Sequence, residues 1–254
     1  MALLRNYAFN TDFSEVYTTQ ANGQVLDPVA APNGIPGRLE IADWGGAIGP
    51  AMRATLVEGD APTAGASSYR SEIAFPHYND GAYWVSWELY IPPGSDGIPS
   101  VFDGTTAQVL RDFDSAGDGN DDPMLGFHMQ DDWLTIKTHA DFVNHSGKQT
   151  SFNQAFVKKG RWVTLAYHIY FDQTGGFREF FVDGKFVVRQ WQLKTVHDEA
   201  GRWYHKVGVY NYTSRSGYTM ARAYYRNVRF YDNNETPESV LGASPIVIDP
   251  VFVI

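Results

Sequence analysis

The stretch "RWVTLAYHIYFDQTGGFREFFVDGKFVVRQW" (residues 161–191) decides the fold class. From Val163 to Phe171 an apolar side chain recurs at every second position, the period of a strand with one buried face. Residues 176–191 hold two more strand patterns around Asp183-Gly184, a dipeptide typical of tight hairpin turns. The stretch therefore predicts a strand followed by a β-hairpin.

Similar patterns extend this prediction to the whole chain. Residues 83–91 and 221–232 also read as strands, and long amphipathic helical windows are nearly absent. The 24 glycines and 13 prolines are scattered, as in a domain with many turns. We expect an all-β fold, a β-jelly roll built as a concanavalin-like sandwich of two antiparallel sheets with a concave substrate groove.

We expect one domain over residues 1–254, in which residues 233–254 form a C-terminal tail. The end of that tail, "SPIVIDPVFVI" (244–254), is apolar, so it should pack against the domain or another subunit. Residues 22–62 and 111–123 read as long loops, the first with a short strand at "GRLEIA" (37–42).

Composition excludes several classes of protein. The net charge of −9 disfavours non-specific nucleic-acid binding, and no apolar run is long enough to cross a membrane as a helix. The absence of cysteine excludes disulfides, thiolate metal sites and a cysteine nucleophile. The N-terminus does not read as a signal peptide; we expect an extracellular or virion-associated protein that is made without a signal or has had it removed.

Familiar catalytic and metal motifs are missing. The sequence has no HExxH, no GxSxG, no Walker loop and no clustered Glu-x-Asp-x-Glu, and its seven histidines show no metal-ligand spacing. We expect no required cofactor. One acidic loop offers oxygen ligands that suit a structural Ca²⁺, although a solvated turn is the favoured reading. Its candidate ligands are Asp112, Asp114, Asp118, Asn120 and Asp122.

Polar side chains gather on one face in three other predicted strands. They are "SSYRSEIAF" (67–75), "TTAQVLRD" (105–112) and "WYHKVGVYNYTSRSG" (203–217). In the third, Lys206, Gly208 and Tyr210 fall on one parity, and Val207 and Val209 fall on the other. This face is either the solvent-exposed side of a half-buried strand or part of a functional site.

The three stretches carry a family resemblance. Alginate lyases of the jelly-roll type carry Arg-Ser/Thr-Glu-Leu, Gln-Ile/Val-His and Tyr-Phe-Lys-Ala-Gly-Val/Ile-Tyr-Asn. This chain has "RSEI" (70–73), "QVL" (108–110) and "YHKVGVYN" (204–211) in the same order. It thus resembles the β-jelly-roll polysaccharide lyases, namely alginate lyases, glucuronan lyases and the heparin-lyase-I-like group, over about residues 65–232.

The resemblance implies β-elimination on a uronic-acid polysaccharide. Arg70 and Gln108 would neutralise the uronate carboxylate, and Tyr210 would be the acid and, in some members, also the base. Lys206 lies roughly 13 Å along the strand from Tyr210, so Arg70 on a neighbouring strand is the better partner for a tyrosine base. The expected substrate-binding residues are Lys206, Glu72, Tyr212, Lys137, His139 and Arg215. The expected partner is an anionic polysaccharide, and the protein is expected to be a monomer or small homo-oligomer.

One position departs from the family pattern, because Leu110 replaces the histidine of Gln-x-His. Three alternatives stay open. Tyr210 does both proton transfers; or His77, His139 or His168 supplies the base; or catalysis is lost and the groove only binds sugar. The last alternative describes a non-catalytic carbohydrate-binding protein. A virion-associated glycan-binding or depolymerase module is a further reading.

Overall fold

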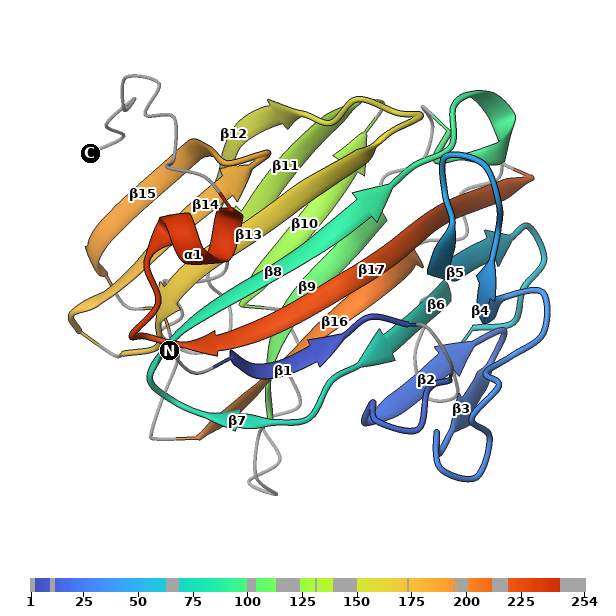
Figure 1. The fold of residues 1–254 in the computed structure, drawn as a ribbon, viewed down its shortest axis with the longest axis horizontal. Coiled ribbons are helices and arrows are strands. Elements are labelled where there is room, and N and C mark those ends of the chain that lie inside the picture. The colour runs from blue at the N-terminus through green and yellow to red at the C-terminus, as the bar shows by residue number, and fades with distance from the viewer. Residues whose placement is uncertain are drawn as a thin grey trace.

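A computed structural model describes most of the chain. The described residues are 3–9, 12–62, 69–99, 104–112, 124–130, 132–138, 150–172, 174–193, 195, 201–211 and 219–242. Of residues 111–112, 130, 138, 150–154 and 192–193, only the backbone is described. Within these ranges the chain folds into two antiparallel sheets that pack face to face (Figure 1).

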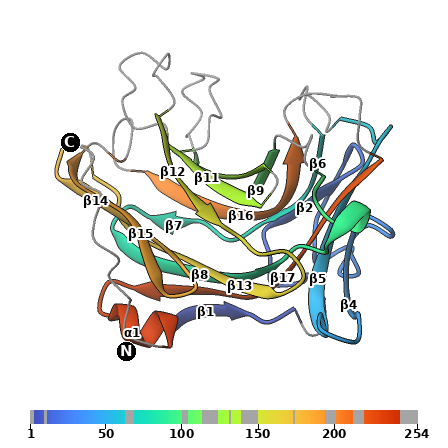
Figure 2. The same ribbon diagram turned by 90° about the horizontal axis from the view of Figure 1, so that it is seen from above.

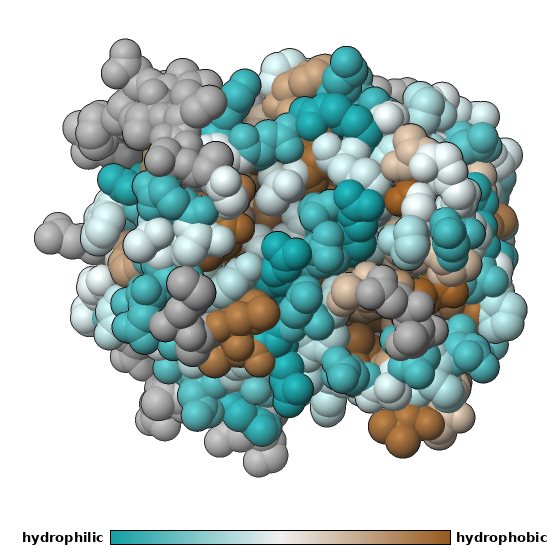
Figure 3. Space-filling view, in the orientation of Figure 1, coloured by the Kyte–Doolittle hydropathy of each residue, from teal (hydrophilic) through white to brown (hydrophobic). Residues whose placement is uncertain are grey.

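The first sheet has eight strands among the described residues and forms the convex layer (Figure 2). Its order is β15 (Lys185–Leu193), β14 (Gly176–Val182), β13 (Trp162–Tyr170), β8 (Ala82–Tyr90), β17 (Met220–Asp232), β5 (Pro50–Val57) and β4 (Leu39–Asp43), and β1 (Leu3–Tyr7) also pairs with β17. A short helix, α1 (Pro237–Leu241), packs Val240 onto its outer face against Trp84 and Tyr231. In Figure 3 this outer face is mainly hydrophilic, with separate hydrophobic patches.

The second sheet has nine strands in the described part of the chain, and it curves so that its outer face is concave (Figure 2). Its order is β12 (Thr150–Phe156), β11 (Trp133–Thr138), β10 (Leu125–Gln130), β9 (Gly104–Asp112), β16 (Arg202–Asn211), β6 (Tyr69–Ala74), β2 (Thr18–Ala21) and β3 (Gln24–Leu26), and β7 (Tyr78–Asn79) also pairs with β16. A single-turn 3₁₀ helix, η1 (Gly94–Asp96), follows β8. The strands lie across the concavity, so a chain lying in it crosses them (Figure 2).

The core lies between the two sheets and is rich in aromatic side chains. Val85, Trp87 and Leu89 of β8 face Val207 and Val209 of β16 within one buried cluster. Alternate residues of each strand enter this cluster, as expected for a sandwich whose inner faces interdigitate. Among the described residues, no helix has the length and apolar character needed to span a membrane.

The all-β sandwich predicted from the sequence is confirmed. The predicted strands over 83–91, 161–171 and 221–232 appear as β8, β13 and β17. The predicted hairpin is β14–β15, and both Asp183 (φ 50°) and Gly184 (φ 69°) have the positive φ that a type I′ turn requires.

The loop predicted over residues 22–62 is wrong for residues 24–26, which form β3 beside β2, and for residues 50–57, which form β5 between β17 and β4. Ala51 and Ala54 have low strand propensity, and burial of Met52, Ala54, Thr55 and Leu56 on both faces removes the alternation that would have revealed the strand. The short strand expected at 37–42 is β4.

Strand β16 places a buried histidine, His205, in the core. The ring of His205 stacks on Phe75 at 5.9 Å between centroids, and its Nδ1 is 3.4 Å from the Tyr167 hydroxyl. Burial lowers the pKa of His205 to about 3. The histidine pKa in an unfolded chain is about 6.5, so in the window between these values the unfolded state binds a proton that the folded state does not.

We therefore expect the free energy of unfolding to fall as pH drops from about 6.5 towards 3. His205→Phe keeps a ring in the core and should remove this contribution, which is about 1.4 kcal/mol per pH unit. Urea unfolding at several pH values measures the slope, and His77→Phe, at a partly exposed ring, is the control. Equal slopes for the wild type and His205→Phe would show that another group governs the acid sensitivity.

Candidate active site

The three sequence motifs meet on adjacent strands of the concave sheet. Strand β16 lies between β9 and β6, so the "KVGVY" stretch has "RSEI" on one side and "QVL" on the other. Tyr210 pairs with Arg70, Gly208 pairs with Glu72, and Lys206 pairs with Gln108. The structure thus brings together five of the predicted site residues, Arg70, Glu72, Gln108, Lys206 and Tyr210.

A buried carboxylate lies at the centre of this group. Lys206 Nζ donates to Glu72 Oε1 at 3.0 Å, and Gln108 Nε2 donates to Glu72 Oε2 at 2.9 Å. Arg70 Nη1 also donates to Oε1, at 3.2 Å. Burial alone would raise the pKa of Glu72, but the charges of Lys206 and Arg70 and the hydrogen bonds from Lys206 and Gln108 lower it below its usual value. Glu72 is therefore an anion that orders two cations and an amide.

The tyrosine lies against one of these cations. The guanidinium carbon of Arg70 is 4.6 Å from the centre of the Tyr210 ring, within the range of a cation–π contact. Arg70 Nη1 also donates to Gln20 Oε1 at 3.3 Å, from the next strand, β2. Gln20 pairs with Glu72 across the strands. No motif marked Gln20 in the sequence, because its partners are about fifty residues away in the chain.

Strands β16, β9 and β10 have different numbers of residues over the interval from Lys206 to Tyr210 and its paired positions. Lys206 and Tyr210 pair with Gln108 and Thr105, so β16 has three residues between them where β9 has two. Gln108 and Thr105 pair in turn with Gly126 and His128, so β10 has one residue in this interval. These bulges bring His128, Thr105, Tyr210 and Arg70 into one line across the sheet, which we call the Tyr210 row.

A residue of the opposite sheet holds these bulges. The Tyr225 hydroxyl lies between Gly208 O at 2.8 Å and Thr106 O at 3.0 Å, and can donate its hydrogen to both. Burial raises the pKa of Tyr225 well above its usual value, so the hydroxyl keeps the proton that it donates. The two carbonyls belong to the irregular part of the β16–β9 pairing, where they need a partner.

Gly208 must be glycine for two reasons. Its φ of 150° is one that other residues rarely adopt. A Cβ there would also lie 2.2 Å from Ser71 O and 2.4 Å from Glu72 Cα, both backbone atoms of β6. The close approach of β16 to β6 at Glu72 therefore depends on the missing side chain.

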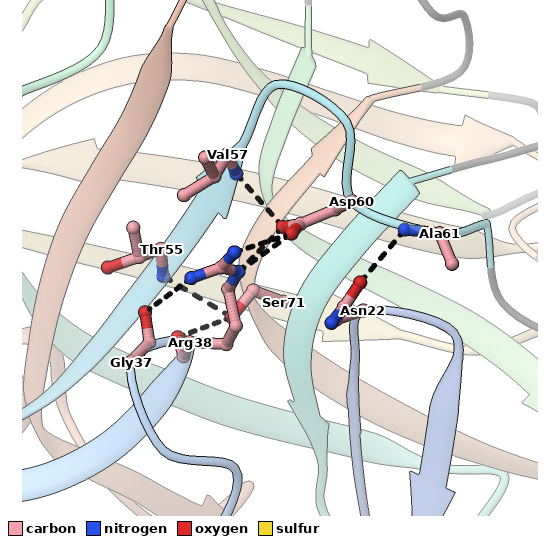
Figure 4. Close-up of polar contacts among 8 residues, drawn as sticks. All are labelled: Asn22, Gly37, Arg38, Thr55, Val57, Asp60, Ala61 and Ser71. Carbon is pink, nitrogen blue, oxygen red and sulfur yellow. Dashed lines mark hydrogen bonds and ion pairs between the residues drawn. The ribbon is translucent and has the colours of Figure 1, made fainter.

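The core side of β6 is tied to the convex sheet by a polar network (Figure 4). Ser71 Oγ donates to Arg38 O at 2.7 Å and accepts from Thr55 N at 3.3 Å. The Arg38 guanidinium pairs with the buried Asp60 carboxylate at 2.8 Å, and Asp60 also accepts from Val57 N. Ser71 lies between Arg70 and Glu72 in the chain, so this network fixes the strand that carries both.

The structure adds a histidine that no sequence motif marked. His128 Nε2 lies 3.4 Å from Thr105 Oγ1, and Thr105 is the residue between His128 and Tyr210 in the Tyr210 row. A sequence pattern could have placed it, because Leu125, Phe127 and Met129 are buried in the core and leave His128 on the other face of β10.

The remaining histidine candidates lie elsewhere. His77 contacts Tyr204 at 4.7 Å between ring centroids, and Tyr204 lies about 20 Å along β16 from Tyr210. His168 belongs to β13 in the other sheet, where it stacks on Trp84 at 4.2 Å and lies 3.1 Å from Glu179. The structure therefore does not bring His77 or His168 to Tyr210, because one is too far along the strand and the other is on the opposite layer.

The structure describes only some of the other candidate residues. Leu110 pairs with Tyr204, on the face of Gln108, as the alternation predicted. Lys137 pairs with Gly126, which pairs with Gln108, so Lys137 lies on the line of Lys206. His139, Tyr212 and Arg215 lie outside the described residues.

The predicted calcium loop also falls outside the described side chains. Asp114, Asp118, Asn120 and Asp122 are not described, and of Asp112 only the backbone is. Within the part of the chain that the structure describes, no group of three or more histidine and acidic side chains could hold a metal ion.

Comparison with known proteins gives a family and a fold. The sequence model of the polysaccharide lyase family matches residues 10–229. No curated protein matches the chain. A substituted family 7 alginate lyase in complex with substrate is 16% identical with a TM-score of 0.62, over 87% of this chain and 93% of that one.

Two further solved structures resemble this fold. An alginate lyase from Pseudomonas aeruginosa is 16% identical over 87% of this chain and 100% of its own, with a TM-score of 0.62. The catalytic domain of a glycoside hydrolase family 131 protein from Coprinopsis cinerea is 16% identical over 93% and 97%, with a TM-score of 0.57. At such identities the likeness shows the fold alone, and the hydrolase shows that this fold does not decide the reaction.

Glu72→Gln should be strongly destabilising, because it leaves Arg70 and Lys206 without their buried anion. We expect a loss of about 3–5 kcal/mol in the free energy of unfolding at pH 7, measured by urea denaturation. The matched control is Glu88→Gln, which breaks the more exposed pair with Arg226 and should cost about 1 kcal/mol or less. Equal losses for the two variants would contradict a central structural role for Glu72.

Proposed function

Because the chain belongs to the polysaccharide lyase family, we propose that its concave sheet cleaves a uronic-acid polysaccharide, such as alginate or glucuronan, by β-elimination. The observation that carries this proposal is the convergence of Arg70, Gln108, Lys206 and Tyr210 around one buried carboxylate. Two cations against one anion leave a net positive charge there, although the whole chain carries −9. An anionic sugar is therefore attracted to this part of the sheet.

The uronate carboxylate is the group that these cations would bind. Glu72 uses one donor of Lys206 and one of Gln108, and a lysine ammonium has three donors and a glutamine amide has two. Their remaining donors can hold the substrate carboxylate, and the Arg70 guanidinium beside them adds positive charge. Hydrogen bonds and positive charge there stabilise the negative charge that develops when the neighbouring C5 proton is removed.

The reaction then needs a base and an acid. The C5–H bond breaks as the base takes the proton, a C4=C5 double bond forms, and the bond from C4 to the glycosidic oxygen breaks. Tyr210 donates its proton to that leaving oxygen, and Arg70 beside its ring stabilises the negative charge left on the phenol.

His128 is the residue that we propose as the base. It lies two strands from Tyr210 in the Tyr210 row, about 10 Å away, with the small Thr105 side chain between them. A sugar ring above Thr105 would lie between the two proton-transfer groups. His128 would thus do what the family histidine does, from β10 instead of from the position of Leu110 on β9.

Tyr210→Phe should lower the rate by about 10²–10⁴-fold while leaving the fold intact, because the ring stays and only the proton is lost. The assay is the ultraviolet absorbance of the unsaturated uronate product, on alginate, glucuronan, heparinoids and capsular glycans. Tyr224→Phe, on the convex layer, is the control. An active Tyr210→Phe variant would refute the acid role, and binding without cleavage of any uronate polymer by the wild type would refute the proposed reaction.

His128→Gln separates the two assignments of the base. If His128 is the base, kcat falls by about 10²–10⁴-fold with a smaller change in KM, and the acidic limb of the pH–kcat profile changes. His77→Gln and His168→Gln should stay close to the wild type. A nearly unchanged kcat for His128→Gln would refute this assignment, and His139→Gln would then decide whether His139 is the base or Tyr210 carries out both proton transfers.

A further inference from the structure

Two large aromatic side chains are exposed on neighbouring strands of the concave sheet. Trp133 of β11 is 44% exposed and Phe156 of β12 is 53% exposed. The two residues pair across the strands, and their ring centroids are 5.7 Å apart at 75°. Only a few large aromatic side chains in the described part of the chain keep as much of their surface in water as this pair does.

Both rings lie on the concave side. Leu134 and Ile136 of β11 are buried in the core between the sheets, and Ala155 of β12 packs against the same core. Because side chains alternate along a strand, Trp133 and Phe156 lie on the opposite face, the face that carries Tyr210.

The register gives their distance from the Tyr210 row. Thr135 of β11 pairs with His128, so β11 meets this row at Thr135, two residues after Trp133. Three strand spacings separate β11 from β16. Trp133 is therefore roughly 16 Å from Tyr210, and Phe156, one strand further, is roughly 20 Å away, a span of several sugar units in a polymer that crosses the strands.

The charges around the pair suit an anionic chain. Asp132, beside Trp133, is paired with Lys159 at 3.4 Å, which offsets its charge. Lys137 lies on the same face of β11, on the line of Gln108 and Lys206. A uronate chain that follows the Tyr210 row to Thr135 of β11 therefore has Lys137 on one side of its path and the two rings on the other.

We propose that Trp133 and Phe156 form a distal subsite, in which the apolar face of a pyranose ring of the same polysaccharide packs several units from the scissile bond. This proposal rests on the proposed function, because the occupant is the substrate itself. Rigid aromatic rings offer a large contact area at a small cost in conformational entropy, and a sugar ring has an apolar face that matches it. The subsite predicts an enzyme that favours long substrates.

The test is the dependence of activity on substrate length, measured with alginate and glucuronan oligosaccharides of graded length. Trp133→Ala should lower kcat/KM at least about tenfold on the polymer and long oligosaccharides, mainly through KM, because tenfold corresponds to about 1.4 kcal/mol of lost contact. Oligosaccharides too short to reach the rings should be cleaved at the wild-type rate. Phe156→Ala should act in the same direction, and Trp133→Tyr should restore most of the preference.

A matched control lies on the other side of the sandwich. Trp191 is 57% exposed and pairs with Phe177 at 5.0 Å, but it belongs to β15 of the convex sheet. Trp191→Ala should leave the cleavage of every substrate unchanged. A Trp133→Ala loss that is equal at all lengths, or no loss at any length, overturns the subsite.

A binding experiment keeps this test separate from the proposed reaction. In the Tyr210→Phe background, the affinity for uncleaved long oligosaccharides should fall about tenfold or more when Trp133→Ala is added, and the affinity for short ones should not. This result would support the subsite even if the wild type cleaved none of the glycans, an outcome that would overturn only the reaction. Equal affinities with and without Trp133→Ala overturn the subsite even in an active enzyme.

Discussion

The arrangement of the concave sheet depends on one buried anion. A carboxylate as buried as that of Glu72 must be paired, and its partners come from Arg70 on its own strand, Lys206 on β16 and Gln108 on β9. The charges and amide that would meet a uronate are therefore already held in place before any sugar arrives. Gly208 permits this arrangement, because a side chain there would collide with the backbone of Glu72.

The alignment of His128 with Tyr210 also requires neighbouring strand segments of unequal length. Because β16, β9 and β10 have three, two and one residues over the same interval, residues without a common sequence pattern come into line. The Tyr225 hydroxyl, from the convex sheet, holds the two carbonyls at this irregularity. The position of Tyr210 relative to His128 is thus a property of both sheets, and the "KVGVY" strand alone does not determine it.

Sequence reasoning predicted the features that repeat locally. Alternation revealed β8, β13 and β17, and Asp183-Gly184 revealed the hairpin, but the doubly buried β5 has no alternation and was missed. Arg70, Gln108 and Tyr210 were found because the family motifs carry them. Gln20 and His128 were not, because no motif marks them. Alternation along β10 could have given the face of His128, but its position in line with Tyr210 follows from strand order and from bulges, as does the contact of Gln20 with Arg70. Leu110 showed that the family histidine was missing. Its position in the sequence did not indicate which other histidine lies near Tyr210.

The bulges also limit how this protein can change over evolution. Removing one residue between Lys206 and Tyr210 would make β16 match β9 in count, but it would turn Tyr210 towards the core. Substitutions on the concave face can alter which sugar is bound without moving the proton carriers. Insertions and deletions within these three strands would move the proton carriers. New specificities should therefore arise here by changes of side chain, and changes of length should be confined to the connecting loops.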